Sequence, residues 1–173
     1  MPRPPLQLVS ESATEAGGSL FRQYSGYVAS IALRLLGRDH EVEDVVQDVF
    51  LAALSGVAGV REKGAIRGWL ATVTVRVVAR RLRVRRLRSF LGLDEAPDYA
   101  LIAHSATAEQ KVIVAEVYRV LDGLRVRDRL AWTLRHAEDL PLDQVALLCN
   151  CSLATVKRSI AVAESAIAKA LDD

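Results

Sequence analysis

The segment that most constrains this chain runs from Gly64 to Arg88 and reads GAIRGWLATVTVRVVARRLRVRRLR. Its apolar residues recur at spacings of three and four, the pattern of one face of an α-helix: Ile66, Trp69, Leu70, Val73 and Val77. The positions around them fill with arginine in the second half of the segment: Arg76, Arg80, Arg81, Arg83, Arg85, Arg86 and Arg88. The pattern predicts a helix with a buried apolar stripe and a cationic outer side.

This cationic side has almost no acidic neighbours in the sequence. Between Val60 and Phe90 the only acidic residue is Glu62. Guanidinium groups that lack carboxylate partners suit a phosphate backbone, so the segment favours nucleic-acid binding. The alternative is a solvated helical face without any partner.

The charges of the chain are unevenly distributed although the formal net charge is only +2. An acidic block precedes the arginines and consists of Asp39, Glu41, Glu43, Asp44 and Asp48. An acidic block next to a basic one indicates two macromolecular surfaces rather than a site for one small substrate.

Composition narrows the class of protein. The 173 residues are 51% hydrophobic and 5% aromatic, so aliphatic side chains must build the core. The start of the chain lacks the features of a signal peptide and no run of 18 apolar residues occurs, so we expect a cytoplasmic protein. Cys149 and Cys151 are too close for a CxxC pair and have no histidine nearby, so we expect no metal and no cofactor.

The periodicity predicts an all-α fold of two small helical domains joined by a flexible linker, the second being a helix-turn-helix domain. Residues 1–18 carry prolines and Gly17-Gly18 and are expected to form a disordered leader. The first domain is expected over 19–90, the linker over 91–107 and the second domain over 108–173. Within the linker, Leu101 and Ile102 could rest on a neighbouring surface.

In the first domain, a helix is expected from Ser19 to the region of Gly37, followed by a helix that Asp39 caps. The second helix should bury one apolar face and turn its polar residues outward: Asp44, Gln47 and Asp48.

The segment LPLDQVALLCNCSLATVKRSIAVAESAIAKAL predicts a helix-turn-helix. Asn150 stands where a left-handed turn residue is needed, and Ser152 can cap the second helix. The side chains at the start of that helix are expected to be free to meet DNA: Thr155, Lys157, Arg158 and Ser159. The alternative is an ordinary antiparallel helix pair, and the later part of the helix is poor in basic residues.

With these motifs the chain resembles the extracytoplasmic-function (ECF) branch of bacterial sigma factors, the short members that have only regions two and four. The resemblance covers roughly residues 19–171. It rests on DVVQDVFLAAL, on IRGWL followed by the basic helix, and on VALLCNCSLATVKRSI, in this order.

The resemblance implies site residues at three places. Asp44, Gln47 and Asp48 match the polymerase-binding motif. On the minus-ten side, a loop that captures an unstacked base corresponds to Arg61, Lys63 and Arg67, and phosphate contacts correspond to Arg76, Arg80 and Arg81. On the minus-thirty-five side, the recognition helix begins with Ser152, Thr155, Lys157 and Arg158.

The chain departs from the family pattern at two places. The family commonly has Asn and Asp where this chain has Arg76 and Arg80, and Lys-Ser-Arg where it has Lys157-Arg158-Ser159. Moving an arginine by one position rotates it by about 100° around a helix. The base contacts of relatives are therefore not carried over to these residues.

The resemblance implies a promoter-specificity subunit that is not an enzyme and takes no small-molecule substrate. Its implied partners are core RNA polymerase, promoter DNA and an anti-sigma factor, which in this family is often membrane-bound. One alternative is an autonomous helix-turn-helix repressor, for which the acidic face would have no use. Another is an enzyme or metal-thiol sensor built on Cys149 and Cys151, although His40, His104 and His136 are scattered and form no legible site.

Overall fold

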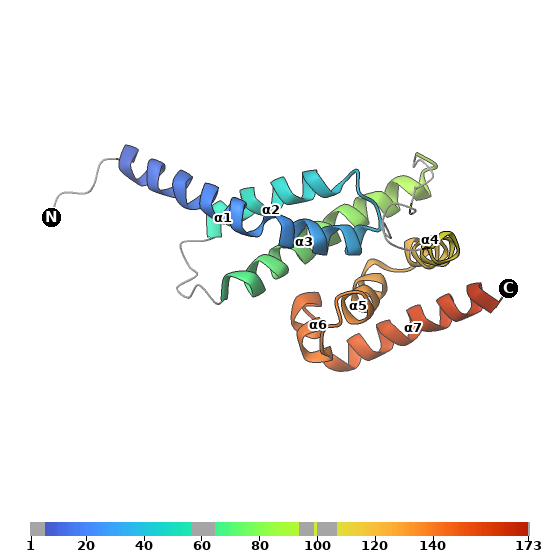
Figure 1. Ribbon diagram of the computed structural model, residues 1–173. Helices are drawn as coiled ribbons and strands as arrows, with labels where there is room; N and C mark the ends of the chain where they lie inside the picture. The colour runs from blue at the N-terminus through green and yellow to red at the C-terminus, as the bar shows by residue number, and fades with distance from the viewer. Residues whose placement is uncertain (1–5, 57–64, 94–98, 100–106, 173) are drawn as a thin grey trace.

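The computed structural model describes residues 6–56, 65–93, 99 and 107–172, and these residues form seven helices and no strand. The helices are α1 (Leu6–Leu36), α2 (Val42–Gly56), α3 (Ile66–Phe90), α4 (Ala108–Gly123), α5 (Val126–His136), α6 (Leu142–Cys149) and α7 (Leu153–Asp172). Figure 1 shows α1, α2 and α3 side by side as a first helical group, with α4 to α7 beneath them as a second helical group. The expected all-α class is confirmed.

Helix α1 begins much earlier than the sequence suggested. It starts at Leu6 rather than near Ser19, so the predicted disordered leader is wrong for residues 6–18, which are helical. Gly17 and Gly18 lie inside the helix, where each glycine costs about 1 kcal/mol relative to alanine. That cost is small enough for the helix to continue through them. Gly37 ends α1 with a φ of 68°, as expected.

The first helical group buries one face of each helix. The expected buried apolar face of α2 is confirmed, and it includes Val46, Val49, Phe50 and Ala53. Helix α1 buries Val28, Ile31 and Leu35 against it. The predicted outward face of α2 is confirmed as well, because Asp44, Gln47 and Asp48 are exposed.

Helix α3 buries a different stripe from the expected one. Of the five apolar residues proposed from spacing, only Leu70 is fully buried, and the others lie at the edge of the core. The buried face is Leu70, Ala71, Thr74, Val75, Val78, Ala79, Leu82 and Arg85. The reason is tertiary: α3 packs on α1 and α2 on one side and on α5 and α6 on another.

The second helical group contains the predicted helix-turn-helix. Helix α6 ends at Cys149 and is followed by Asn150, whose φ of 50° and ψ of 52° place it in the left-handed region. Ser152 then caps α7 by accepting a hydrogen bond from the backbone N–H of Thr155 at 3.2 Å. The turn chemistry expected from the sequence is therefore confirmed. The inward face of α7 comprises Val156, Ser159, Ile160, Ala163 and Ile167.

The two helical groups are packed together. One continuous core joins residues of α1, α2 and α3 to Leu130, Ala131 and Leu134 of α5 and to Val145 of α6. The sequence had suggested that the linker would allow many arrangements, but the structure has a closed one. Leu101 and Ile102 of the linker lie outside the described residues.

The described residues contain neither a single membrane-length apolar helix nor a cluster of metal-ligating side chains. No single helix is both long and apolar enough to cross a membrane, and only α6 and α7 taken together, with a bend of 97°, have that composition. In the same residues, no three His, Cys, Asp or Glu side chains are grouped in a way that could hold a metal ion.

Candidate functional site

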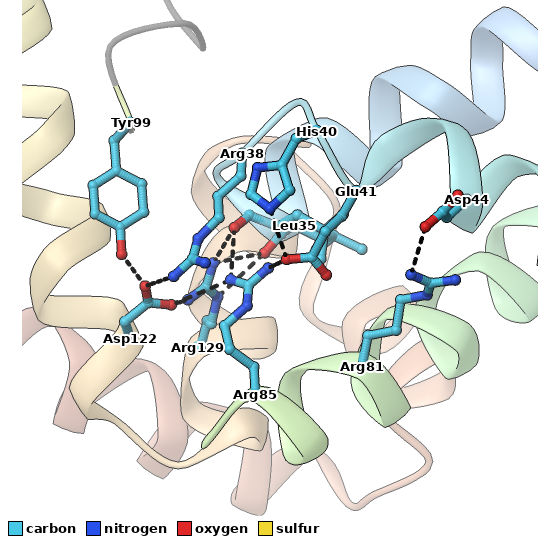
Figure 2. Close-up of polar contacts among 11 residues, drawn as sticks. Leu35, Arg38, His40, Glu41, Asp44, Arg81, Arg85, Tyr99, Asp122 and Arg129 are labelled. Atoms are coloured by element: carbon cyan, nitrogen blue, oxygen red, sulfur yellow. Dashed lines mark hydrogen bonds and ion pairs between the residues drawn. The ribbon is translucent and has the colours of Figure 1, made fainter. Parts of the chain in front are cut away.

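The acidic face of α2 lies directly beside the arginine side of α3. Arg81 contacts Asp48 at 2.6 Å and Asp44 at 3.6 Å, and Figure 2 shows the second of these contacts. The side chains of Asp44 and Asp48 remain 65% and 49% exposed. The expectation that the arginines lack carboxylate partners is therefore wrong for Arg81, because α2 and α3 bring together charges that are far apart in the sequence.

The remaining arginines of α3 divide into an exposed and a buried set. Arg85 is buried and contacts Glu41, the residue directly before α2. It therefore does not lie on the outer cationic side, where the sequence had placed it. Arg67 lies over the ring of Tyr27, 4.4 Å from its centre. The other arginines of the helix are exposed: Arg76, Arg80, Arg83, Arg86 and Arg88. Arg61 and Lys63 lie outside the described residues.

A groove of about 900 Å³ separates α3 from the helix-turn-helix. Arginines line its α3 wall, together with exposed apolar side chains near the end of that helix. The opposite wall consists of α5, α6 and the turn that holds Asn150 and Cys151. The structure thus brings Arg76 and the helix-turn-helix turn to the same groove.

The start of α7 presents most of the polar side chains that the sequence proposed. Ser152, Lys157 and Arg158 are exposed, and Thr155 is half-buried between Ser152 and Arg158. Ser159 is only 2% exposed, so it is not free to meet DNA. Ser159 lies three positions after Val156, so the helical period places both on the inward face of α7.

A polar cluster joins the two helical groups and was not proposed from the sequence. Arg129 of α5 donates hydrogen bonds to the carbonyl oxygens of Leu35, at 3.1 and 3.2 Å, and of Leu36, at 2.7 Å. These carbonyls are among the last of α1 and have no helical partner of their own. Arg129 therefore satisfies the end of a helix in the other group.

Asp122, near the end of α4, lies at the centre of this cluster (Figure 2). Its carboxylate contacts Arg129, Arg38 at 3.3 Å and Arg85 at 3.7 Å, and it accepts a hydrogen bond from the Tyr99 hydroxyl. The three guanidinium groups come from α5, from the α1–α2 turn and from α3. One carboxylate thus ties both helical groups together.

The buried position of Arg129 in this cluster could have been predicted from the helical period. In α5, Arg129 lies between Val126 and Thr133 at spacings of three and four, on the face that carries Leu130 and Leu134. A charged residue on an inward face requires a buried partner. The sequence did not reveal that the partners would be Asp122 and the end of α1.

Burial changes the titration of several groups in this region. The pKa of Arg129 is lowered to about 9, mainly by burial and secondly by the positive charge of the neighbouring Arg85. Burial also raises the pKa of Tyr118 to about 12, and its hydroxyl donates to the carbonyl of Arg34 at 2.6 Å. Each shift has the sign expected when a charged form is removed from water.

The two cysteines are free thiols on either side of the helix-turn-helix turn. Burial raises the pKa of Cys149 to about 12, so this thiol is far from the thiolate form that nucleophiles and metal ligands need. This environment does not favour a thiol-based site.

Comparison with known proteins extends these observations. Residues 20–88 match the sigma-70 region 2 family. Three curated relatives align over most of the chain. The ECF RNA polymerase sigma factor SigE of Mycolicibacterium smegmatis is 27% identical over 87% of this chain and 59% of its own length. The sigma-E factor of Haemophilus influenzae is 24% identical over 90% of this chain and 87% of its own length. SigW of Bacillus subtilis is 22% identical over 97% of this chain and 95% of its own length.

Two solved structures share the fold across both helical groups. The sigma factor RpoE of Bartonella quintana, in complex with the anti-sigma factor NepR, superposes with a TM-score of 0.66 at 18% identity, over 90% of this chain and 96% of that one. CnrH, in complex with the cytosolic domain of CnrY, gives a TM-score of 0.58 at 21% identity, over 95% of each chain. Residues 20–88 therefore fall in the sigma-70 region 2 family, and the relatives that align over both helical groups are ECF sigma factors.

Proposed function

We propose that this chain is an ECF-type sigma factor that binds core RNA polymerase in the cytoplasm and directs promoter-specific transcription initiation. The observation that carries the proposal is the presence of three chemically distinct surfaces on one small helical chain. These are the acidic face of α2, the arginine side of α3 and the polar start of α7. A sigma factor acts by binding and strand capture and needs no catalytic residues of its own.

The acidic face of α2 is the proposed polymerase surface, formed by Asp44, Gln47 and Asp48. All three side chains are exposed on one face of the helix. Arg81 occupies part of that face, but exposed ion pairs contribute only about 0.2–1 kcal/mol. A basic partner surface that offers several charges can therefore replace Arg81 at small cost.

The arginine side of α3 is the proposed minus-ten surface. Arg67, Arg76 and Arg80 are exposed and suit phosphate contacts. Arg81 joins them once α2 engages another partner. Arg61 and Lys63 precede α3 in the sequence and remain proposed contacts to an unstacked base.

The start of α7 is the proposed minus-thirty-five surface. In a helix-turn-helix, the first residues of the second helix reach base edges in the major groove. Lys157 and Arg158 are exposed there, while Ser152 and Thr155 form the cap beside them. Few basic residues follow later in α7, so the proposed surface is confined to the first two turns of that helix.

An anti-sigma factor is the proposed regulatory partner. RpoE and CnrH, which share the fold, are both described in complexes, with the anti-sigma factor NepR and with the cytosolic domain of CnrY. The groove between α3 and α6 combines arginines with exposed Leu87, Phe90 and Leu147, a surface that suits an amphipathic helix with acidic residues.

Run-off transcription with purified bacterial core polymerase tests the proposal, with the DNA upstream of the gene for this chain as template. We expect a transcript that requires both the polymerase and this chain. A footprint of the free chain on the same DNA, without any transcript, would instead favour an autonomous repressor.

Two sets of variants assign the surfaces. The double change Asp44→Lys and Asp48→Lys should weaken core binding in a pull-down without loss of helical circular dichroism, and Glu109→Lys on α4 is the charge control. Replacing Lys157 and Arg158 by alanine should lower promoter affinity and reduce its dependence on salt. Unchanged core binding, or an unchanged salt slope, would place the contacts elsewhere.

A further inference from the structure

The groove between α3 and the helix-turn-helix carries arginines on both of its walls. Arg76, Arg83 and Arg86 line it on α3, and Arg127 lines it on α5. All four residues are exposed, and none of the described residues that line the groove is acidic. Positive charge is therefore concentrated in this groove and is open to solvent.

The arginines of the groove differ from others of the chain in their partners. In the described part of the chain, the arginines that form ion pairs with carboxylates lie outside the groove: Arg34, Arg38, Arg81, Arg85, Arg119, Arg125 and Arg129. Within the groove, Arg86 donates a hydrogen bond to the carbonyl oxygen of Leu124 at 3.0 Å. Guanidinium groups without carboxylate partners in a partly enclosed groove attract anions.

The spacing of these arginines sets the kind of anion that can neutralise them. Arg76, Arg83 and Arg86 are separated by seven and three positions, so they lie on one side of α3 and extend over about 15 Å of its length. A single carboxylate or phosphate cannot contact both ends of such a row. A ligand that uses the whole row must carry several anionic groups.

Arg127 adds positive charge from the opposite wall. Burial raises the pKa of Cys149, the last residue of α6, and the positive charge of Arg127 opposes that rise. The guanidinium group of Arg127 is therefore close to the helix-turn-helix turn, which lines the same groove. A polyanion in the groove meets positive charge from two helices rather than from one basic helix alone.

The groove also offers contacts to a planar apolar group. Val75 and Leu130 line it and are 2% and 4% exposed, whereas Phe90 lines it and is 88% exposed. Asn150, which is exposed on the opposite wall, has a side-chain amide. An exposed aromatic ring can stack on a nucleobase, and an amide can donate to and accept from the edge of a base. Such contacts do not suit an inorganic anion.

We propose that this groove binds a nucleotide that carries several phosphates, such as a nucleoside triphosphate. The phosphates contact the arginines of both walls, and the base packs on Phe90. The volume of about 900 Å³ is in the range of sites for small organic ligands. The same groove is the proposed contact of an anti-sigma helix, with which a nucleotide would compete. That competition rests on the proposed function, whereas the nucleotide site does not.

Isothermal titration calorimetry of the full chain with ATP and GTP tests the site without DNA, polymerase or any other protein. We expect one nucleotide to bind per chain. Adenosine, which lacks the phosphates, and inorganic tripolyphosphate, which lacks the base, should each bind about tenfold more weakly than ATP. Tripolyphosphate that binds as tightly as ATP would overturn the nucleotide assignment. No heat of binding at millimolar ATP or GTP would overturn the site itself.

Arg83→Ala and Arg127→Ala distinguish the groove from a general attraction of anions to a basic helix. Each removes one arginine from one wall, so each should weaken ATP binding about tenfold through loss of a charge-assisted hydrogen bond. Arg88→Ala is the matched control, because Arg88 is exposed on the same helix as Arg83 but does not line the groove. Unchanged affinity in Arg127→Ala, or an equal loss in Arg88→Ala, would overturn the groove as the site.

A short oligothymidylate distinguishes a free nucleotide from a nucleic-acid strand, which offers the same phosphates and bases. We expect Arg127→Ala to leave the affinity for this strand unchanged while it weakens ATP binding. An oligothymidylate that binds more tightly than ATP and loses affinity in Arg127→Ala would show that the groove takes a strand instead. These titrations do not depend on transcription, so they stand or fall separately from the proposed function.

Discussion

Gly37 is a position where one added methyl group tests the closed packing of the two helical groups. It ends α1 with a φ of 68°, and a Cβ placed on it would lie 2.3 Å from Cδ1 of Tyr118, with two further ring carbons at 2.8 and 2.9 Å. Tyr118 belongs to α4, in the second group. Gly37→Ala therefore pushes directly against the contact between the groups.

The expected loss of stability has two parts. An alanine in the left-handed region costs about 1–2 kcal/mol, and overpacking a buried contact costs about 1–3 kcal/mol more. Gly92→Ala isolates the first part, because Gly92 also has a φ of 68° but a Cβ there would meet nothing within 4 Å. We expect Gly37→Ala to lower the free energy of unfolding by about 1–3 kcal/mol more than Gly92→Ala does.

Urea unfolding followed by circular dichroism measures both variants, and a double-mutant cycle with Tyr118→Ala identifies the contact. Without the ring, the cost of Gly37→Ala should fall to that of Gly92→Ala. Equal costs for the two glycine variants in the wild-type background would refute the packing of α4 against the end of α1. An undiminished cost in the Tyr118→Ala background would show that another group causes the strain.

Further expectations concern three residues of the helix-turn-helix. Ser152→Ala should lower the free energy of unfolding by about 0.5–2 kcal/mol through loss of the cap of α7, which thermal unfolding would detect. Asn150→Ala should cost about 1–2 kcal/mol in the same measurement, while Asn150→Gly, which relieves the left-handed strain, should not. Cys149 should be alkylated by iodoacetamide at pH 8 about a thousandfold more slowly than an ordinary thiol, as peptide mapping would report. Because the folded thiol keeps a proton that the unfolded one releases, Cys149 should also make the fold less stable as pH rises from 9 towards about 12.

Local features of this chain followed from its sequence alone. The turn at Asn150 was predictable because few residue types tolerate a positive φ, and the cap at Ser152 because its hydroxyl reaches a backbone N–H within one turn. The outward position of Asp44 and Asp48 followed from the helical period in the same way. These properties depend on residues a few positions apart, so a linear sequence contains them.

Two expectations about single helices failed, the first because local preferences were close in energy and the second because of tertiary packing. The glycines at 17 and 18 and the early prolines suggested disorder up to residue 18, but helix α1 begins at Leu6. The apolar spacing in α3 selected residues at the edge of the core, because this helix is covered on two sides rather than one.

The partners of the arginines were decided only by the tertiary structure. In the sequence, Arg76, Arg81 and Arg85 look equivalent, yet the first is exposed, the second pairs with Asp48 and the third is buried against Glu41. Arg129 caps a helix 94 positions earlier in the chain. A guanidinium group meets water, a carboxylate or a helix end according to which helices pack beside it, and that packing is a property of the whole fold.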